Sequence, residues 1–282
     1  MANEYAEMDQ WSDDEVAIFK THYQSSKARK DKNSKLTVIS EGDSWFNYKV
    51  GTDLIDCLRN FHGYEIKNYA SPGDTLENMI YGSEINYHFE RVTPQVETVL
   101  ERIEKDQPEV FLFSGAGNDI AGDAFITFLH HAESGLGVLK RGFAIDTINV
   151  GFRKFYQDLI AKVADVSPKT HIFSHGYGYA RPTGNGVGIL GVSFFGPWLL
   201  PALSCKGINP DQEGRQAVEE LVNLFNEMLK ALDEEVEKFH YIDLRPLICD
   251  NDWRDELHLK SSAYRLAADQ FDLAINKVYP DI

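Results

Sequence analysis

The chain has few cysteines for its length, and they lie far apart. Cys57, Cys205 and Cys249 are the only three among 282 residues, and no two of them have CxxC spacing. Three dispersed cysteines do not make a disulfide framework, so the sequence predicts reduced thiols and a cytoplasmic protein. The nine histidines show no ligand spacing, which predicts that the chain binds no metal.

Positive charge is also scarce. The 28 Lys and Arg residues stand against 44 Asp and Glu residues, which gives a formal net charge of −16. Nucleic acids and anionic membranes are negatively charged, so neither is an expected partner of this chain. An uncharged or weakly charged small molecule fits this balance better.

Long hydrophobic runs are missing too. The first sixteen residues are acidic and lack the basic start and apolar stretch of a secretory signal, so none is predicted. Residues 187–203 carry no charge, but Pro197, Pro201 and several glycines argue against a membrane-spanning helix. We therefore expect no membrane span.

The sequence does contain short apolar, β-branched runs of the kind that form buried strands. There are five of them, at residues 35–40, 64–69, 110–114, 171–174 and 240–244. Helical patterns separate them, most clearly at residues 218–239 and 259–278, where apolar residues recur at three- and four-residue steps. Strands that alternate with helices predict a three-layer α/β/α fold with a five-stranded parallel sheet, whose ligands bind at the carboxyl ends of the strands.

Three short fragments supply the side chains of a nucleophilic site. They read Gly42-Asp43-Ser44, Gly117-Asn118-Asp119 and Asp255-Glu256-Leu257-His258. A serine hydroxyl needs an imidazole to take its proton, and the imidazole needs a carboxylate to orient it. Asp255 stands three residues before His258, so it can accept from Nδ1 while Nε2 points outward. The sequence predicts Ser44, His258 and Asp255 as the catalytic residues.

Together with Asn68-Tyr69-Ala70-Ser71-Pro72-Gly73-Asp74-Thr75, these fragments resemble in their order the SGNH hydrolase superfamily, the GDSL-type esterases and lipases. The resemblance extends from about residue 36 to residue 278. It implies a flavodoxin-like sheet, and an oxyanion hole formed by the backbone N–H groups of Ser44 and Gly73 with the side chain of Asn118. Two positions depart from the family pattern, since Trp45 replaces the usual leucine and Ala116 stands where glycine is usual.

Several nearby residues compete for these roles. Asp250, Asp252 and Glu256 are alternative carboxylates, but only Asp255 has the spacing of the family. His175 also follows a strand, and a buried histidine of the cleft wall is the favoured interpretation. Two further acidic residues, Asp43 and Asp119, are predicted to hold turns through their side chains.

The domain organisation is predicted as a charged, helical extension over residues 1–34 and one hydrolase domain over residues 35–282. Within that domain, residues 176–210 form an insertion rich in glycine and apolar residues. It is interpreted as a flap over Ser44 or, equally, as a buried excursion or a subunit contact. The predicted substrate contacts are Trp45, Phe194, Phe195 and Trp198.

These observations predict a serine hydrolase that cleaves carboxylic esters through an acyl-enzyme and needs no cofactor. The substrate is expected to be a small-molecule, lipid or carbohydrate ester. Two alternatives stay open. One is an O-acetyl-carbohydrate deacetylase or an acyltransferase that uses the same residues, and the other is a non-catalytic acyl- or carbohydrate-binding protein of the same fold.

Overall fold

The computed structural model describes residues 35–84, 88, 93–189 and 192–280, so the predicted extension over residues 1–34 lies outside the described residues. A parallel five-stranded sheet with the order β2-β1-β3-β4-β7 forms the centre. Its strands are β1 Val38–Gly42, β2 Ile66–Asn68, β3 Val110–Ser114, β4 His171–His175 and β7 Phe239–Ile242. The predicted fold class, a flavodoxin-like three-layer α/β/α arrangement, is confirmed.

Two of the three inner strands, β1 and β3, show why the sequence folds this way. All five residues of β1 and all five of β3 are buried, as expected for strands covered on both faces. The predicted start of β1 at Lys35 was too early, because pairing with β3 runs from Val38 opposite Val110 to Gly42 opposite Ser114. A Cβ at Gly42 would lie 2.7 Å from the Ser114 carbonyl oxygen, so only glycine allows this close approach.

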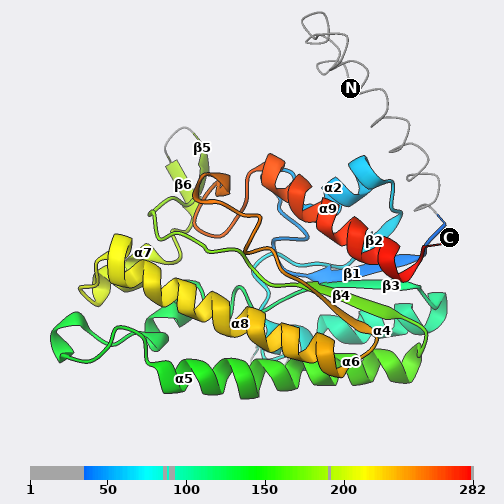
Figure 1. The fold of residues 1–282 in the computed structure, drawn as a ribbon, viewed down its shortest axis with the longest axis horizontal. Helices are drawn as coiled ribbons and strands as arrows, with labels where there is room; N and C mark the ends of the chain where they lie inside the picture. The colour runs from blue at the N-terminus through cyan, green and yellow to red at the C-terminus, as the bar shows by residue number, and fades with distance from the viewer. Residues whose placement is uncertain (1–34, 85–87, 89–92, 190–191, 281–282) are drawn as a thin grey trace, which may run out of the picture.

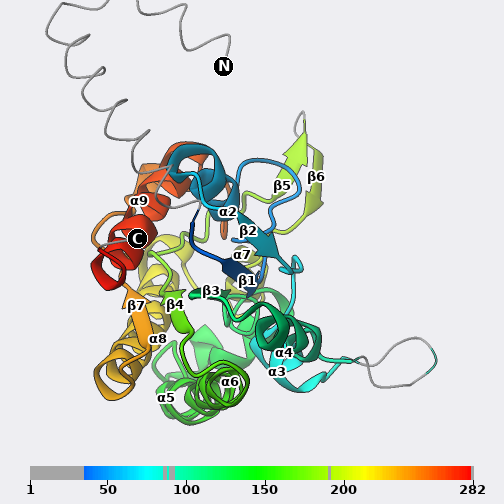
Figure 2. The ribbon, with the colours of Figure 1, turned by 90° about the vertical axis from the view of Figure 1, so that its right-hand side faces the viewer.

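Helices cover both faces of the sheet (Figures 1 and 2). One layer holds α2 Leu54–Cys57 and α9 Ser261–Val278, and the other holds α4 Gln95–Asp106, α6 Arg153–Val166 and α8 Arg215–Glu235. The helix predicted over residues 218–239 is α8, which begins three residues earlier and ends four residues earlier than expected. Its buried residues recur along one face, including Val218, Leu221 and Phe225.

Shorter elements complete the helical layers. They are η2 Leu58–His62, α3 Leu76–Tyr81, η3 Gly122–Phe128, η4 Ala132–Ser134, α5 Arg141–Asp146, η5 Thr147–Phe152, η6 Pro210–Gly214 and η7 Asp250–Asp252.

In the described part of the chain, no helix has the length and apolar character to cross a bilayer.

The insertion over residues 176–210 follows β4. It contains the antiparallel pair β5 Val187–Ile189 and β6 Val192–Phe195, and then α7 Leu200–Cys205. Figures 1 and 2 show this hairpin outside the two helical layers. The segment between β4 and α7 therefore lies at the carboxyl edge of the sheet, where ligands of such folds bind.

Candidate active site

Ser44 lies just beyond β1, on a tight turn at the carboxyl edge of the sheet. The Asp43 carbonyl accepts hydrogen bonds from the backbone N–H groups of Phe46 at 3.1 Å and Asn47 at 3.2 Å. Asp43 Oδ1 also accepts from the Trp45 N–H at 2.9 Å. These bonds fix the turn, and they bear out the sequence argument that Asp43 holds it.

His258 and Asp255 lie on the loop before α9 and reach Ser44. His258 Nε2 is 2.7 Å from Ser44 Oγ, and His258 Nδ1 is 2.9 and 3.0 Å from the two carboxylate oxygens of Asp255. An ionised carboxylate can only accept, so Nδ1 carries a proton and Nε2 can accept from the serine. The structure thus brings together the three residues predicted to be catalytic, although they span 214 positions of sequence.

The local sequence shapes this loop. The backbone N–H groups of Leu257 and His258 both donate to Asp255 Oδ1, at 2.9 and 2.8 Å. Burial raises the pKa of Asp255, but the hydrogen bond and charge of His258 outweigh it and hold that pKa below its usual value. Asp255 is therefore ionised at neutral pH and can stabilise a protonated imidazole.

The competing carboxylates have other partners. Asp252 Oδ2 accepts from the Cys249 N–H at 2.7 Å. Asp250 pairs with Arg181 at 2.6 Å and with Arg215 at 3.1 Å. Within the described residues, no three His, Cys, Asp or Glu side chains are grouped so that they could hold a metal ion.

The predicted oxyanion donors lie on the loops after β2 and β3. Asn118 Nδ2 donates to the Asp74 carbonyl at 2.8 Å, and its amide has a second N–H to offer a ligand. Gly73 is exposed and has a φ of 84°, a left-handed angle that favours glycine. Ala116, at the family's usual glycine position, has the same φ of 84°. That angle is the physical reason for glycine there in the family.

An apolar pocket opens beside Ser44 and Asn118. Its other walls come from the loop into η3, from the insertion, from α8 and from the loop before α9. The lining residues are Asp43, Trp45, Gly117, Ile120, Ala121, Phe125, Tyr177, Gly178, Ala180, Leu199, Val218, Leu221, Val222, Phe225, Trp253 and Leu257. Such a pocket beside a nucleophile is where a substrate is expected to bind.

The four side chains predicted to contact substrate lie in different surroundings. Trp45 is buried and lines the pocket. Trp198 sets the edge of its ring against His258, with ring centroids 5.5 Å apart. Phe195 is 67% exposed, and the side chain of Phe194 lies outside what the structure describes.

A sequence comparison decides the family. The model of the GDSL-like lipase/acylhydrolase family matches residues 34–271 of the chain. The chain belongs to this family. It is an ester-cleaving hydrolase, and the resemblance carried by its four sequence blocks is confirmed.

A solved structure shows the same fold at low sequence identity. The lipase Lip_vut3 from a goat rumen metagenome is 13% identical, with 85% of this chain and 97% of that chain covered and a TM-score of 0.54. A family 3 carbohydrate esterase of Clostridium thermocellum is also 13% identical, with 86% and 96% covered and a TM-score of 0.47. No curated protein sequence matches the chain.

Tyr48 is a residue of the hydrolase site that sequence reasoning missed. Its ring stacks on the imidazole of His258, with ring centroids 4.3 Å apart, and its hydroxyl donates to Asp255 Oδ2 at 3.2 Å. Burial and the neighbouring Asp255 raise the pKa of Tyr48 to about 12, so the hydroxyl keeps its proton. Tyr48 thus holds both partners of the acid–base pair.

A buried polar group lies behind Ser44. Tyr177 donates to Asp43 Oδ2 at 2.6 Å and accepts from the Gly117 N–H at 3.2 Å. Ser114 Oγ lies 2.9 Å from Asp43 Oδ1 and 3.0 Å from His175 Nε2. Burial lowers the pKa of His175 to about 4, so this histidine is neutral. It is a buried wall histidine, in agreement with the favoured interpretation of the sequence.

Glu256 connects the catalytic loop to the insertion. It is fully buried, and its Oε2 accepts from the backbone N–H groups of Trp198 at 2.5 Å and Leu199 at 2.6 Å. Its Oε1 accepts from Gly184 at 2.8 Å and Leu200 at 3.1 Å. One carboxylate, placed between Asp255 and His258 in sequence, therefore fixes four N–H groups of the insertion.

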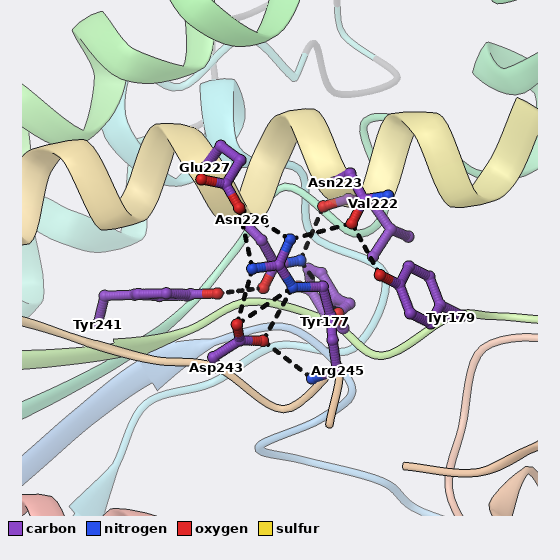
Figure 3. Close-up of polar contacts among 9 residues, drawn as sticks. All are labelled: Tyr177, Tyr179, Val222, Asn223, Asn226, Glu227, Tyr241, Asp243 and Arg245. Atoms are coloured by element: carbon purple, nitrogen blue, oxygen red, sulfur yellow. Dashed lines mark hydrogen bonds and ion pairs between the residues drawn. The ribbon is translucent and has the colours of Figure 1, made fainter. Parts of the chain in front are cut away.

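A second polar network fixes the pocket wall from the side of α8 (Figure 3). Asn226 donates to the carbonyl of Tyr177 at 3.1 Å, and its Oδ1 accepts from Tyr241 at 2.5 Å. Arg245 binds Asp243 and reaches across to Glu227 on α8 at 3.1 Å. These bonds hold α8 against the end of β7 and against the segment that carries Tyr177.

Proposed function

We propose that the hydrolase cleaves carboxylic esters through an acyl-enzyme on Ser44. His258 Nε2 takes the proton of Ser44 as the oxygen attacks the ester carbonyl, and Asp255 stabilises the imidazolium that forms. The imidazolium then gives its proton to the leaving alcohol. Water then attacks the acyl carbonyl from the side that the alcohol left, with His258 as its base. The imidazolium returns the proton to the Ser44 oxygen as the acyl–serine bond breaks and the acid is released.

The observation that carries this proposal is the unbroken line of contacts from Ser44 to His258 to Asp255, with 2.7 Å between serine oxygen and imidazole nitrogen. That distance is within the range required of a nucleophile and its base. The oxyanion would lie between the N–H groups of Ser44 and Gly73 and the Nδ2 of Asn118. Removing one such donor typically costs about 10² to 10³ in turnover.

Labelling with a fluorophosphonate tests the proposal, because this probe reacts only with an activated serine. We expect the wild-type protein to be labelled at Ser44 and to hydrolyse short p-nitrophenyl esters. The Ser44→Ala variant should fold normally and lose both reactions, with turnover down by about 10⁶, the loss seen when a triad serine is removed from a serine protease. Wild-type ester hydrolysis by a folded Ser44→Ala protein would overturn the proposal.

A further inference from the structure

A chain of buried polar side chains lies behind the nucleophile, and the hydrolysis mechanism does not use it. His175 Nδ1 is 3.1 Å from the Gly176 carbonyl oxygen, and His175 Nε2 is 3.0 Å from Ser114 Oγ. Ser114 Oγ is 2.9 Å from Asp43 Oδ1, and the Tyr177 hydroxyl is 2.6 Å from Asp43 Oδ2. All four side chains are buried, so their own protons must complete these contacts.

The ordinary protons of these groups do not suffice for the four contacts. Each contact needs one hydrogen between its two heavy atoms. The Gly176 carbonyl can only accept, so it takes the single N–H of a neutral imidazole, and the hydroxyls of Ser114 and Tyr177 supply one hydrogen each. That makes three hydrogens for four contacts. The fourth must be an additional proton, carried by Asp43 as a carboxylic acid or by His175 as an imidazolium.

The surroundings of Asp43 and His175 decide which of them carries the additional proton. The His175 imidazole packs among the rings of Trp45, Phe46 and Phe271, with ring centroids 4.9, 5.9 and 5.8 Å away. Burial lowers the pKa of His175 to about 4. Burial also raises the pKa of Asp43, and it outweighs the hydrogen bonds that this carboxyl accepts. Both directions put the proton on Asp43.

Other titratable groups surround Asp43 on several elements. They are Glu41 on β1, Asp74 and Asp119 on the loops after β2 and β3, His258 before α9, and the tyrosines Tyr156, Tyr177 and Tyr264. The three acids disfavour a charge on Asp43, whereas a charged His258 would favour it, with less effect than burial. Burial raises the pKa of each tyrosine, so their hydroxyls keep their protons.

We propose that Asp43, Ser114 and His175 form a buried Asp–Ser–His chain in which Asp43 is a neutral carboxylic acid at neutral pH. Asp43 Oδ1 donates its proton to Ser114 Oγ, and the Ser114 hydroxyl donates to His175 Nε2. The imidazole then donates from Nδ1 to the Gly176 carbonyl, so that every contact of the chain holds one hydrogen.

The neutral carboxyl makes Asp43 a positioning residue for the oxyanion hole. It holds the turn that presents the Ser44 N–H, and through Tyr177 it is connected to the Gly117 N–H, next to Asn118. A carboxylate at this place would oppose the negative charge that develops on the substrate oxygen in the transition state. This catalytic role rests on the proposed function, since it assumes that an oxyanion forms beside Ser44.

Carbon NMR of the full-length protein, labelled at the aspartate carboxyl carbons, tests where the proton lies. We expect a carboxylic-acid resonance at pH 7 that disappears in Asp43→Asn. It should stay in Asp146→Asn, which changes an exposed aspartate of α5. Nitrogen NMR of labelled histidine needs no Asp43 variant: the His175 signals, identified with His175→Gln, should be those of a neutral imidazole protonated at Nδ1. A carboxylate at Asp43, or a proton on His175 Nε2, would overturn the proposal.

Activity tests what the proton does. As pH rises and the Asp43 resonance moves to the carboxylate position, kcat/KM for a short p-nitrophenyl ester should fall by up to about tenfold per pH unit. Asp43→Asn cannot ionise, so its kcat/KM should show no such fall. The same fall in Asp43→Asn, or a constant wild-type kcat/KM while Asp43 ionises, would overturn the positioning role.

Labelling with the fluorophosphonate separates this proposal from the one beneath it. A protein that holds Asp43 protonated but is not labelled at Ser44 would overturn the serine mechanism and leave the proton assignment in place. A protein that is labelled at Ser44 but holds Asp43 as a carboxylate at pH 7 would overturn the buried chain and leave the serine mechanism in place.

Discussion

Asp255 binds the imidazole of His258 with both of its oxygens, and this geometry makes a prediction at the scale of single residues. In Asp255→Asn the amide cannot stabilise the imidazolium and favours the wrong tautomer, so kcat/KM for a short p-nitrophenyl ester should fall by about 10²–10⁴. Asp252→Asn is the control and should keep wild-type kinetics, because the side chain of Asp252 accepts a hydrogen bond from the backbone N–H of Cys249 instead. A crippled Asp252→Asn beside an active Asp255→Asn would show that the wrong carboxylate was assigned.

Tyr48 is expected to act through Asp255 rather than on the substrate. Tyr48→Phe removes the hydroxyl bonded to Asp255 and keeps the ring stacked on His258. A hydrogen bond to a charged group is worth about 1.5 kcal/mol or more, so kcat should fall by about tenfold with little change in KM. Tyr279→Phe, which removes a hydroxyl that binds the Glu109 carbonyl, should match wild type. Equal kcat values for Tyr48→Phe and Tyr279→Phe would contradict the role assigned to the Tyr48 hydroxyl.

The two histidines near Ser44 should respond differently to pH. The base that accepts the serine proton must be unprotonated to do so, and kcat/KM should therefore fall at low pH. His175 has a pKa lowered by burial to about 4, so it stays neutral through the assay range. His175→Gln should therefore keep the acid limb at its wild-type position, whereas His258→Ala should lose nearly all turnover. Loss of the acid limb in a folded His175→Gln protein would mean that His175 is the base.

At the scale of elements, Glu256 joins the insertion to the catalytic loop. Glu256→Gln replaces an acceptor oxygen by an N–H₂ group that faces backbone N–H donors, so the insertion should loosen around Trp198 and Leu199. We expect amide hydrogen exchange of residues 184–200 to speed up by about tenfold or more, and KM to rise more than kcat falls. The exposed Glu213 provides the control variant, Glu213→Gln. Unchanged exchange in residues 184–200 would contradict the role of Glu256.

The elements themselves could be predicted largely from the sequence. Strand β3 is short and nearly continuous in apolar residues, and α8 repeats its buried residues at helical steps, so local pattern carries the information. Strand ends were less certain, because Gly42 belongs to β1 only through its pairing with Ser114. The contact of Tyr48 with Asp255 joins residues 207 positions apart, and no local pattern encodes it. The four bonds of Glu256 likewise depend on a tertiary fold.

At the scale of the whole molecule, parallel strands that are buried on both faces are unfavourable positions for a charged side chain. Glu41 nevertheless lies on β1, directly before Gly42, Asp43 and Ser44. It is fully buried, and neither of its carboxyl oxygens has a hydrogen-bond partner among the described residues. Burial, with a smaller contribution from the charges of Asp74 and Asp43, raises the pKa of Glu41 to about 9. The folded protein therefore holds this carboxyl protonated at neutral pH.

This proton makes the stability of the whole fold depend on pH. Unfolded, Glu41 has an ordinary pKa near 4.5, so between about pH 5 and 9 the folded state binds a proton that the unfolded state releases. The free energy of unfolding must then fall as pH rises, by at most about 1.4 kcal/mol per pH unit from this group. Glu41→Gln cannot ionise, so its stability relative to wild type should increase steadily with pH. Urea unfolding at pH 6, 7 and 8 measures this difference, and the exposed Glu65 gives the control, Glu65→Gln. A constant difference between Glu41→Gln and wild type across that range would show that Glu41 is already ionised in the folded protein.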